Sequence, residues 1–151
     1  MATTAQERTP VHLWIVGALA LLFGCFGGYD YLMTRMRNTD YIAGSMPGVD
    51  PNAALAWVDS MPLYAQVGWG LGVWLGLAGA LLLLLRSRWA VWAYGLSFVG
   101  AVLSLGYQLA LAPPLPGADA TIYKVMPVVI ILITLALFLY VRVMEKKGVL
   151  R

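Results

Sequence analysis

The sequence predicts an all-α integral membrane protein, a bundle in which four helices cross the bilayer. Four long apolar stretches, at residues 13–31, 63–85, 89–111 and 126–143, take up over half of the 151-residue chain. Each is near or above the roughly 18 to 20 residues that a helix needs to cross about 30 Å of hydrocarbon. Because 61% of the residues are hydrophobic and only 11% are charged, a water-soluble domain of this size would expose much of that apolar surface.

We expect one integral membrane domain that covers residues 1–151. Its helices are predicted at about 11–36, 62–85, 89–111 and 122–145. The first helix begins after Thr9, a capping residue, with Pro10 in its first turn, where the N–H that proline lacks would have no helical partner. The chain therefore consists of a polar N-terminal tail, four helices and a short basic C-terminal tail.

The connections between the helices differ in character. Only Arg86, Ser87 and Arg88 join the second and third helices, so these two must form an antiparallel hairpin, with tryptophans at its corner that fit the aromatic belt of a membrane surface. Prolines at 113, 114 and 116 exclude a regular helix from the connection at 112–118.

The connection at 36–62 contains a helix signal of its own. Asp50 is a capping residue and Pro51 follows at the first helical position, before a run of helix-forming residues. We expect a short interfacial helix here, lying on the outer membrane surface with Leu55, Trp57 and Val58 dipping into the bilayer.

Basic residues predict the orientation of the chain. Seven of the ten lysines and arginines lie on the side of the bilayer that holds both termini and the turn at 86–88. The other side holds only Arg35, Arg37 and Lys124, among several aspartates. The positive-inside bias therefore predicts cytoplasmic termini and an external loop at 36–62. Because the basic residues flank membrane helices and form no continuous basic face, nucleic-acid binding is not expected.

Few residues point to catalysis. His12 is the sole histidine and Cys25 the sole cysteine, which leaves no histidine or cysteine metal cluster, no bis-histidine haem and no Ser/His/Asp triad. No carboxylates recur at the three- or four-residue spacing of a di-iron bundle site. We expect a non-enzymatic protein with no catalytic residue, no bound metal and no cofactor.

Small residues on the second helix indicate close helix packing. The predicted packing face consists of Gly68, Gly72 and Gly76. Association in lipid depends on close backbone approach, which small residues at four-residue spacing permit. A glycine-lined conduit is the alternative, but it needs polar groups in mid-membrane, and this helix has none between Gln66 and Arg86.

A candidate ligand site lies where the helices reach the outer surface. Asp30 is an ionisable residue near the outer end of the first helix, and such residues within membrane spans are functional candidates. We expect it to share one outer mouth with polar and aromatic residues from the other helix ends, which are Tyr64, Gln66, Tyr107, Gln108, Tyr123 and Lys124. The mouth could bind a small polar ligand. Alternatively the tyrosines form an aromatic belt and Asp30 pairs with Lys124 or Arg35.

One observation opposes a buried role for Asp30. It is two residues from Gly28, about 200° on a helix of 3.6 residues per turn. A glycine stripe that includes Gly28 and faces inward would therefore turn Asp30 outward.

Several segments resemble a known family. They are residues 8–17 (RTPVHLWIVG), 29–34 (YDYLMT), Arg37-Asn38, 86–91 (RSRWAV), Tyr107-Gln108 and 147–151 (KGVLR). Together they are similar to a family of small four-helix proteobacterial inner-membrane proteins of unknown function, some of which are loosely labelled sugar transporters. The resemblance implies a multi-pass protein of the bacterial inner membrane. Members often have Trp-Asn where this chain has Phe23-Gly24, and the loss of that amide makes a deep polar site less expected.

Two functions follow from these features. The first is an accessory or partner subunit, in a lipid bilayer, of a homo-oligomer or a larger membrane complex, because packing surface is extensive and polar groups in mid-membrane are few. The second is a component of a transporter for a sugar-like or other polar solute. The surroundings of Ser97, Ser104 and Gln108 should discriminate between the two functions. If these side chains are buried against the glycine face, the subunit is favoured; if they face a hydrated cavity, transport is favoured.

Overall fold

The computed structural model describes residues 8–151, which form six helices and no strand. The long helices are α1 (Val11–Arg35), α4 (Leu63–Leu84), α5 (Trp89–Ala110) and α6 (Ala120–Lys146), and each is long and apolar enough to cross a membrane. Two short helices, α2 (Thr39–Ser45) and α3 (Pro51–Asp59), lie in the connection between α1 and α4. Every end of a long helix lies within two residues of its expected position.

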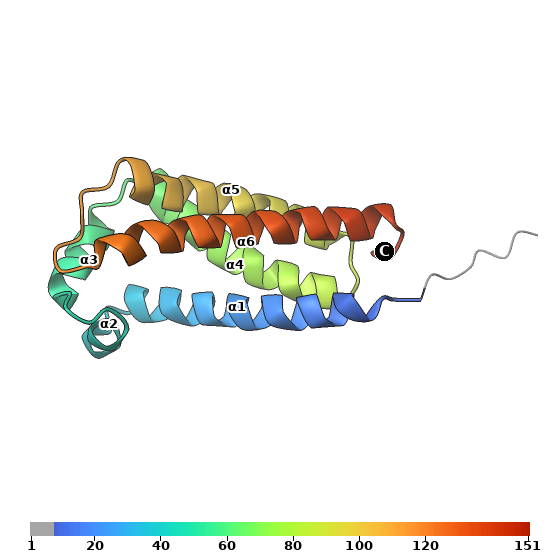
Figure 1. Ribbon diagram of the computed structural model, residues 1–151, viewed down its shortest axis with the longest axis horizontal. Helices are drawn as coiled ribbons and strands as arrows, with labels where there is room; N and C mark the ends of the chain where they lie inside the picture. Colours follow the sequence, from blue (N-terminus) through green and yellow to red (C-terminus); the bar gives the residue numbers. More distant parts are fainter. Residues whose placement is uncertain (1–7) are drawn as a thin grey trace, which may run out of the picture.

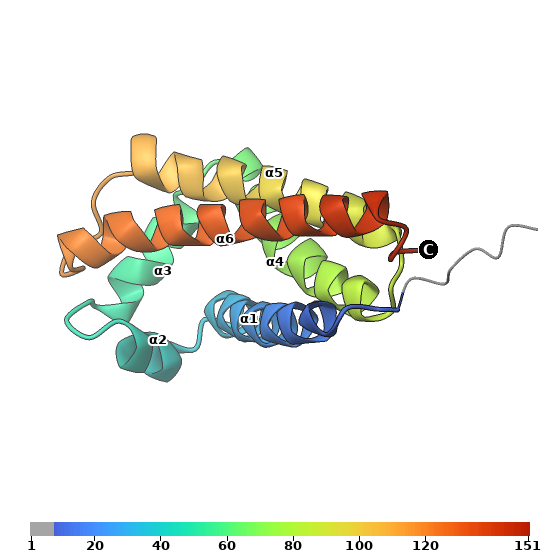
Figure 2. The ribbon, with the colours of Figure 1, turned by 45° about the vertical axis from the view of Figure 1, so that its right-hand side comes forward.

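The long helices run side by side in an elongated bundle (Figure 1). In sequence order each packs on the next, α1 on α4, α4 on α5 and α5 on α6, with the most extensive contact between α4 and α5. We call the end with α2, α3 and the 111–119 connection the capped end, and the end with the 86–88 turn and residues 147–151 the terminal end. Figure 2 shows α1 along one edge of the bundle and α5 along the other, with α4 and α6 between them.

Glycines bring α4 and α5 into close contact. A Cβ added at Gly68 would lie 2.8 Å from the carbonyl oxygen of Gly100, and one added at Gly72 would lie 3.3 Å from the amide nitrogen of Ala101. A Cβ at Gly76 would lie 3.1 Å from Oγ of Ser97. The three glycines predicted to form a packing face thus all lie against α5, where only the absence of a side chain lets the backbones approach so closely.

The terminal end is closed by the last residues of the chain. The amide of Arg88 donates to the carbonyl of Arg151 at 2.9 Å, and the amide of Arg151 donates to the carbonyl of Arg86 at 2.7 Å. Val149 and Leu150 are buried in a core cluster with residues of all four long helices. Two segments that are far apart in sequence, 86–88 and 147–151, therefore form one structure at this end.

The structure corrects the expected interfacial helix. Two short helices are present instead of one, and Leu55 is only 5% exposed because it packs in a cluster with Ile42, Val49 and Leu115. The indole N–H of Trp57 donates to the carbonyl oxygen of Pro113 at 2.9 Å. The expectation that Leu55 dips into lipid was wrong, because the proline-rich connection supplies an apolar side chain, Leu115, for α3 to pack on.

An ion pair joins the end of α1 to α3. Arg37 donates two hydrogen bonds to the carboxylate of Asp59, at 3.2 and 2.9 Å, and this is the only ion pair within residues 8–151. The hydrogen bond from Arg37 lowers the pKa of the Asp59 carboxyl group. Because both side chains are well exposed, water and salt screen the pair, and it positions the cap more than it stabilises the fold.

Gly100→Ala should destabilise the bundle. The added Cβ would lie 2.6 Å from the carbonyl oxygen of Gly68 and 2.7 Å from the amide nitrogen of Gly72. Both are backbone atoms that cannot rotate away, so the helices must separate, at a cost of about 1 to 3 kcal/mol. The readout is the thermal unfolding midpoint of the purified protein in detergent.

Gly106→Ala is the matched control for this variant. Gly106 lies in the same helix, but a Cβ there meets no atom within 4 Å, and alanine favours a helix over glycine by about 1 kcal/mol. Its midpoint should stay the same or rise. Equal midpoints for the two variants would show that the α4–α5 contact is looser than described.

Candidate functional site

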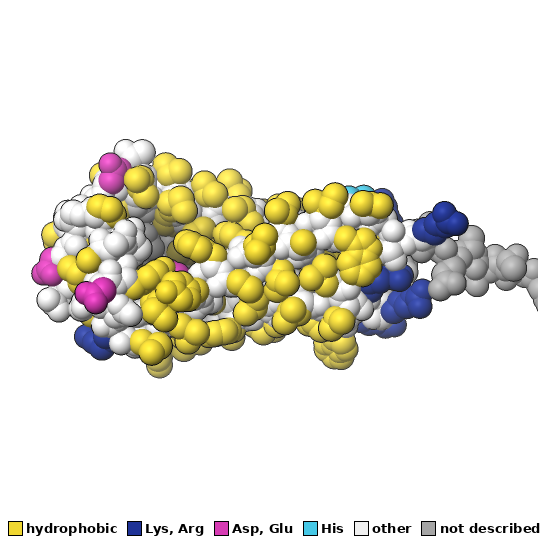
Figure 3. Space-filling model, turned by 90° about the horizontal axis from the view of Figure 1, so that it is seen from below, with side chains coloured by type: hydrophobic (Ala, Val, Ile, Leu, Met, Phe, Trp, Pro, Cys, Tyr) yellow, Lys and Arg dark blue, Asp and Glu magenta, His cyan; other side chains and the backbone are white. Residues whose placement is uncertain are grey.

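A cavity of about 200 Å³ lies among the four long helices. Each helix contributes to its wall: Phe23 and Asp30 from α1, Trp69 from α4, Ser104 from α5 and Ile130 from α6 are representative lining residues. In Figure 3 the bundle is hollowed beside the capped end, and an acidic side chain is visible within the hollow. The cavity begins at Asp30 and extends toward the terminal end as far as Tyr94 and Leu137.

The cavity opens on the flank between α1 and α6. These helices pack on different partners, α4 and α5, and meet near the terminal end, where His12 Nδ1 and the Tyr140 hydroxyl lie 2.6 Å apart. Phe23 and Phe26 line the cavity and yet are 39% and 70% exposed, so they stand at its rim. In a membrane crossed by the four long helices, this flank would face lipid tails.

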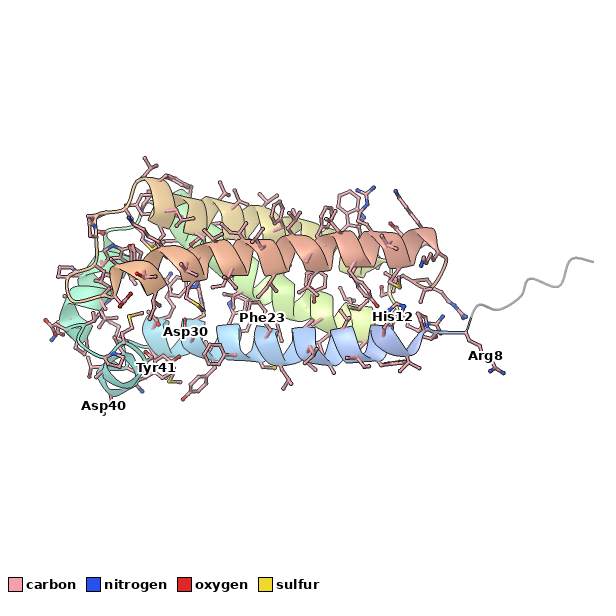
Figure 4. The ribbon with its side chains drawn as sticks, viewed as in Figure 1. Arg8, His12, Phe23, Asp30, Asp40 and Tyr41 are labelled. Atoms are coloured by element: carbon pink, nitrogen blue, oxygen red, sulfur yellow. The ribbon has the colours of Figure 1, made fainter. Side chains whose placement is uncertain are left out.

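One face of α1 explains why Asp30 points into the cavity. Phe23, Gly27 and Asp30 are spaced by four and then three residues, which places them on one side of a helix. In Figure 4, Phe23 and Asp30 both lie on the side of α1 that faces α6. The stripe with Gly24 and Gly28 instead lies against Leu77 of α4.

The expected outward orientation of Asp30 was therefore wrong. It assumed that α1 has a single inward face. The structure gives α1 two such faces, one packed on α4 and one bordering the cavity, because the bundle is open between α1 and α6.

A hydrogen bond from α2 holds the Asp30 carboxylate. The Tyr41 hydroxyl donates to Oδ1 of Asp30 at 2.8 Å (Figure 4). Desolvation of Tyr41, with the hydrogen bond to Asp30 second, raises its pKa to about 12. The hydroxyl is therefore protonated at neutral pH and remains a donor. The ring of Tyr29 packs edge-on against that of Tyr41, with centroids 5.4 Å apart.

The predicted ion pair of Asp30 is not formed. Lys124 is exposed, and the side chain of Arg35 donates instead to Oε1 of Gln66 at 3.3 Å. Within residues 8–151 no cation lies within ion-pair distance of Asp30. The partner of Asp30 is the neutral hydroxyl of Tyr41, from a part of the 36–62 connection in which no helix was predicted.

Four hydroxyl groups line the deeper part of the cavity, on Tyr94, Ser97, Ser104 and Thr134. The buried Tyr94 hydroxyl has no hydrogen-bond partner among residues 8–151. The Ser97 hydroxyl donates to the carbonyl oxygen of Gly72 at 2.7 Å, and the Thr134 hydroxyl donates to that of Ile130 at 2.7 Å. Both side chains are buried and line the cavity, as does Ser104. Since the hydrogens of Ser97 and Thr134 are already used, these oxygens can only accept from a bound molecule.

The predicted outer mouth is divided into separate contacts. The rings of Tyr64 and Tyr107 pack edge-on with centroids 6.1 Å apart. Gln108 donates to the backbone carbonyl of Tyr123 at 3.3 Å, and Gln66 donates to that of Met61 at 2.9 Å. Of the seven predicted mouth residues only Asp30 lines the cavity. The tyrosines and glutamines among the others make contacts at the helix ends, and Lys124 is exposed.

Sequence reasoning missed most of the cavity wall. Phe23, Phe26 and Gly27 precede Asp30 at helical spacing, and this pattern was a usable signal for one shared face. Tyr41 gave no such signal, since its contact with Asp30 depends on how α2 folds back over the end of α1.

Neither a metal-binding cluster nor a similar known protein points to a function for this cavity. Residues 8–151 contain no group of three or more histidine, cysteine, aspartate or glutamate side chains arranged to hold a metal ion. Comparisons of the chain with models of protein families, with curated proteins and with solved structures give no match. The function must therefore be argued from the cavity itself.

Tyr41→Phe should loosen α2 from the end of α1. The substitution keeps the ring and removes the donor to Asp30, at a cost of about 1 kcal/mol for one hydrogen bond. Hydrogen exchange of the α2 amides should therefore accelerate severalfold. Tyr29→Phe is the control, since no hydrogen bond of its hydroxyl is present in the structure while its ring contact with Tyr41 remains. Equal exchange in both variants would mean that the Tyr41 hydrogen bond does not hold α2.

Proposed function

We propose that this protein binds a small, largely apolar molecule in the cavity between its long helices, as the ligand-binding component of a membrane transport or transfer system. The observation that carries the proposal is a cavity that contains one carboxylate and opens on the flank between α1 and α6. Ionisable groups are costly within a membrane, and those that persist there usually serve a ligand, ion or proton.

The cavity wall favours an apolar ligand over a sugar. Side chains such as Phe23, Met126, Ile130 and Leu137 make up most of it, with few hydrogen-bonding groups among them. A polyhydroxylated solute would lose its hydrogen bonds to water without replacement, at a cost of about 1 to 3 kcal/mol for each unpaired group. An apolar molecule already dissolved in the bilayer loses no such bonds.

An accessory or partner subunit is the second candidate. The open flank favours it, because α1 packs mainly on α4 and a helix from another chain, or from a second copy, could fill the space beside Gly27. Ser97 meets the condition set for this candidate, since it packs against Gly72 and Gly76, and it also lines the cavity. Recovery of only monomeric protein in several mild detergents would count against this candidate.

The charges support a bacterial inner-membrane protein with both termini in the cytoplasm. Seven of the ten basic residues lie at the terminal end, and Figure 3 shows basic side chains gathered there, with acidic ones at the capped end. The positive-inside bias assigns the basic end to the cytoplasm. The capped end would then face the outside.

Gly27→Leu should abolish ligand binding while leaving the fold intact. Gly27 lines the cavity, and a Cβ there meets no atom within 4 Å, so leucine fills the cavity without displacing packed atoms. The measurement is saturable labelling of the full-length protein in lipid nanodiscs by photoreactive alkyl probes, with the labelled residues identified by mass spectrometry.

Gly106→Leu is the control for the labelling experiment. A Cβ at Gly106 also meets no atom within 4 Å, and this residue is not part of the cavity wall. Its labelling should match that of the wild type. Undiminished saturable labelling in Gly27→Leu, or its absence from the wild type, would contradict a binding role for the cavity.

Reporter fusions test the orientation. A reporter that is active only in the cytoplasm should be active when fused after Arg151 and inactive when inserted near Asn52, because the opposite topology would move seven basic residues outside in exchange for three. A periplasm-specific reporter at the same two positions should give the reverse pattern. Activity of the cytoplasmic reporter near Asn52 alone would overturn the proposed orientation.

A further inference from the structure

We propose, on the basis of the ligand-binding function above, that the cavity selects lipophilic cations, that is, molecules with an amine or ammonium head and a hydrocarbon body. The first reason is charge. Asp30 is the only ionisable acid or base in the cavity wall apart from the Tyr94 phenol, and no lysine, arginine or histidine lines it. A single carboxylate in an apolar wall attracts a cation and repels an anion more strongly than it would in water.

The geometry of Asp30 supports this selection. Tyr41 holds Oδ1, while Oδ2 accepts no hydrogen bond from any of residues 8–151. A carboxylate oxygen can accept more than one hydrogen bond, so the fixed side chain offers an acceptor to the cavity that it lines. A cationic N–H donor would satisfy that acceptor and its charge together.

Two of the four hydroxyl groups of the wall agree with this choice, whereas those of Tyr94 and Ser104 donate to no group within residues 8–151. Ser97 and Thr134 have donated their hydrogens to backbone carbonyls, so they offer lone pairs to a bound molecule. A carboxylate or phosphate head would be repelled by the lone pairs of Ser97 and Thr134 and by the charge of Asp30. An ammonium head could instead donate hydrogen bonds to these groups.

Aromatic rings complete a cation site beside the carboxylate. Phe23 and Phe26 lie on the same helix as Asp30, about two turns and one turn away, and Trp69 of α4 also lines the cavity. The faces of such rings attract cations, most strongly where water is excluded, and they bind hydrocarbon as well. The rings therefore suit both parts of the proposed ligand.

The size of the cavity limits the body of the ligand. Its volume of about 200 Å³ exceeds that of an engineered apolar cavity of about 150 Å³ that binds benzene. One ring or a short hydrocarbon chain fits inside, and a longer chain would extend between α1 and α6 into the bilayer. The head reaches Asp30 by the same flank.

Three photoreactive probes that share one alkyl chain test the proposal. Their heads are a primary ammonium, a hydroxyl and a carboxylate. Saturable labelling is measured on full-length protein in nanodiscs, with protein-free nanodiscs to subtract partitioning. The ammonium probe should half-saturate wild-type protein at a concentration at least about tenfold lower than the hydroxyl probe, because an interaction with a charged group exceeds a neutral one by this much. The carboxylate probe should label least.

Asp30→Asn should remove the preference for the ammonium probe and keep labelling by the hydroxyl probe. Asparagine has the same shape and can still accept from Tyr41, so retained hydroxyl labelling shows that the cavity is folded. Equal affinity for ammonium and hydroxyl probes in the wild type, or an ammonium preference that survives Asp30→Asn, would overturn cation selection while leaving the binding function standing. Loss of every saturable signal from the wild type would overturn both.

Discussion

The close contact between α4 and α5 is the constraint on which the rest of this structure depends. Gly68, Gly72 and Gly100 bring the two backbones so near that no side chain fits between them. α1 packs on the α4 side of this pair, and α6 packs on the α5 side. α1 and α6 thus pack on different helices, and the cavity lies among all four.

A carboxylate can persist in such a space only if the structure provides for it. Burial of a charge is costly, and the cost falls when hydrogen bonds and access to polar surroundings remain. Asp30 lies near the capped end, where Tyr41 donates to it and α2 is held in turn by its own capping residue, Asn38. The ion pair of Arg37 and Asp59 fixes the adjoining chain. The cap therefore acts on the cavity by positioning one side chain.

Hydropathy and glycine spacing predicted the parts of this fold that depend on a single helix or on one helix pair. The four spans follow from composition, and the spacing of Gly68, Gly72 and Gly76 follows from the need for close approach in lipid. The direction of Asp30 could not be obtained in this way, because it depends on which of two faces of α1 meets α4. The burial of Leu55 likewise depends on Leu115, sixty residues later.

The packing at the two ends of the bundle determines from which direction a molecule can enter the cavity. Tyr41 packs on the cluster of Ile42, Val49 and Leu115, which lies beyond the Asp30 end of the cavity. Toward the terminal end, Tyr94 belongs both to the cavity wall and to the core cluster that buries Val149. Apolar clusters thus lie beyond both ends of the cavity, while the flank between α1 and α6 stays open. This arrangement suits exchange of a ligand with the surrounding lipid, and it opposes a continuous aqueous pore.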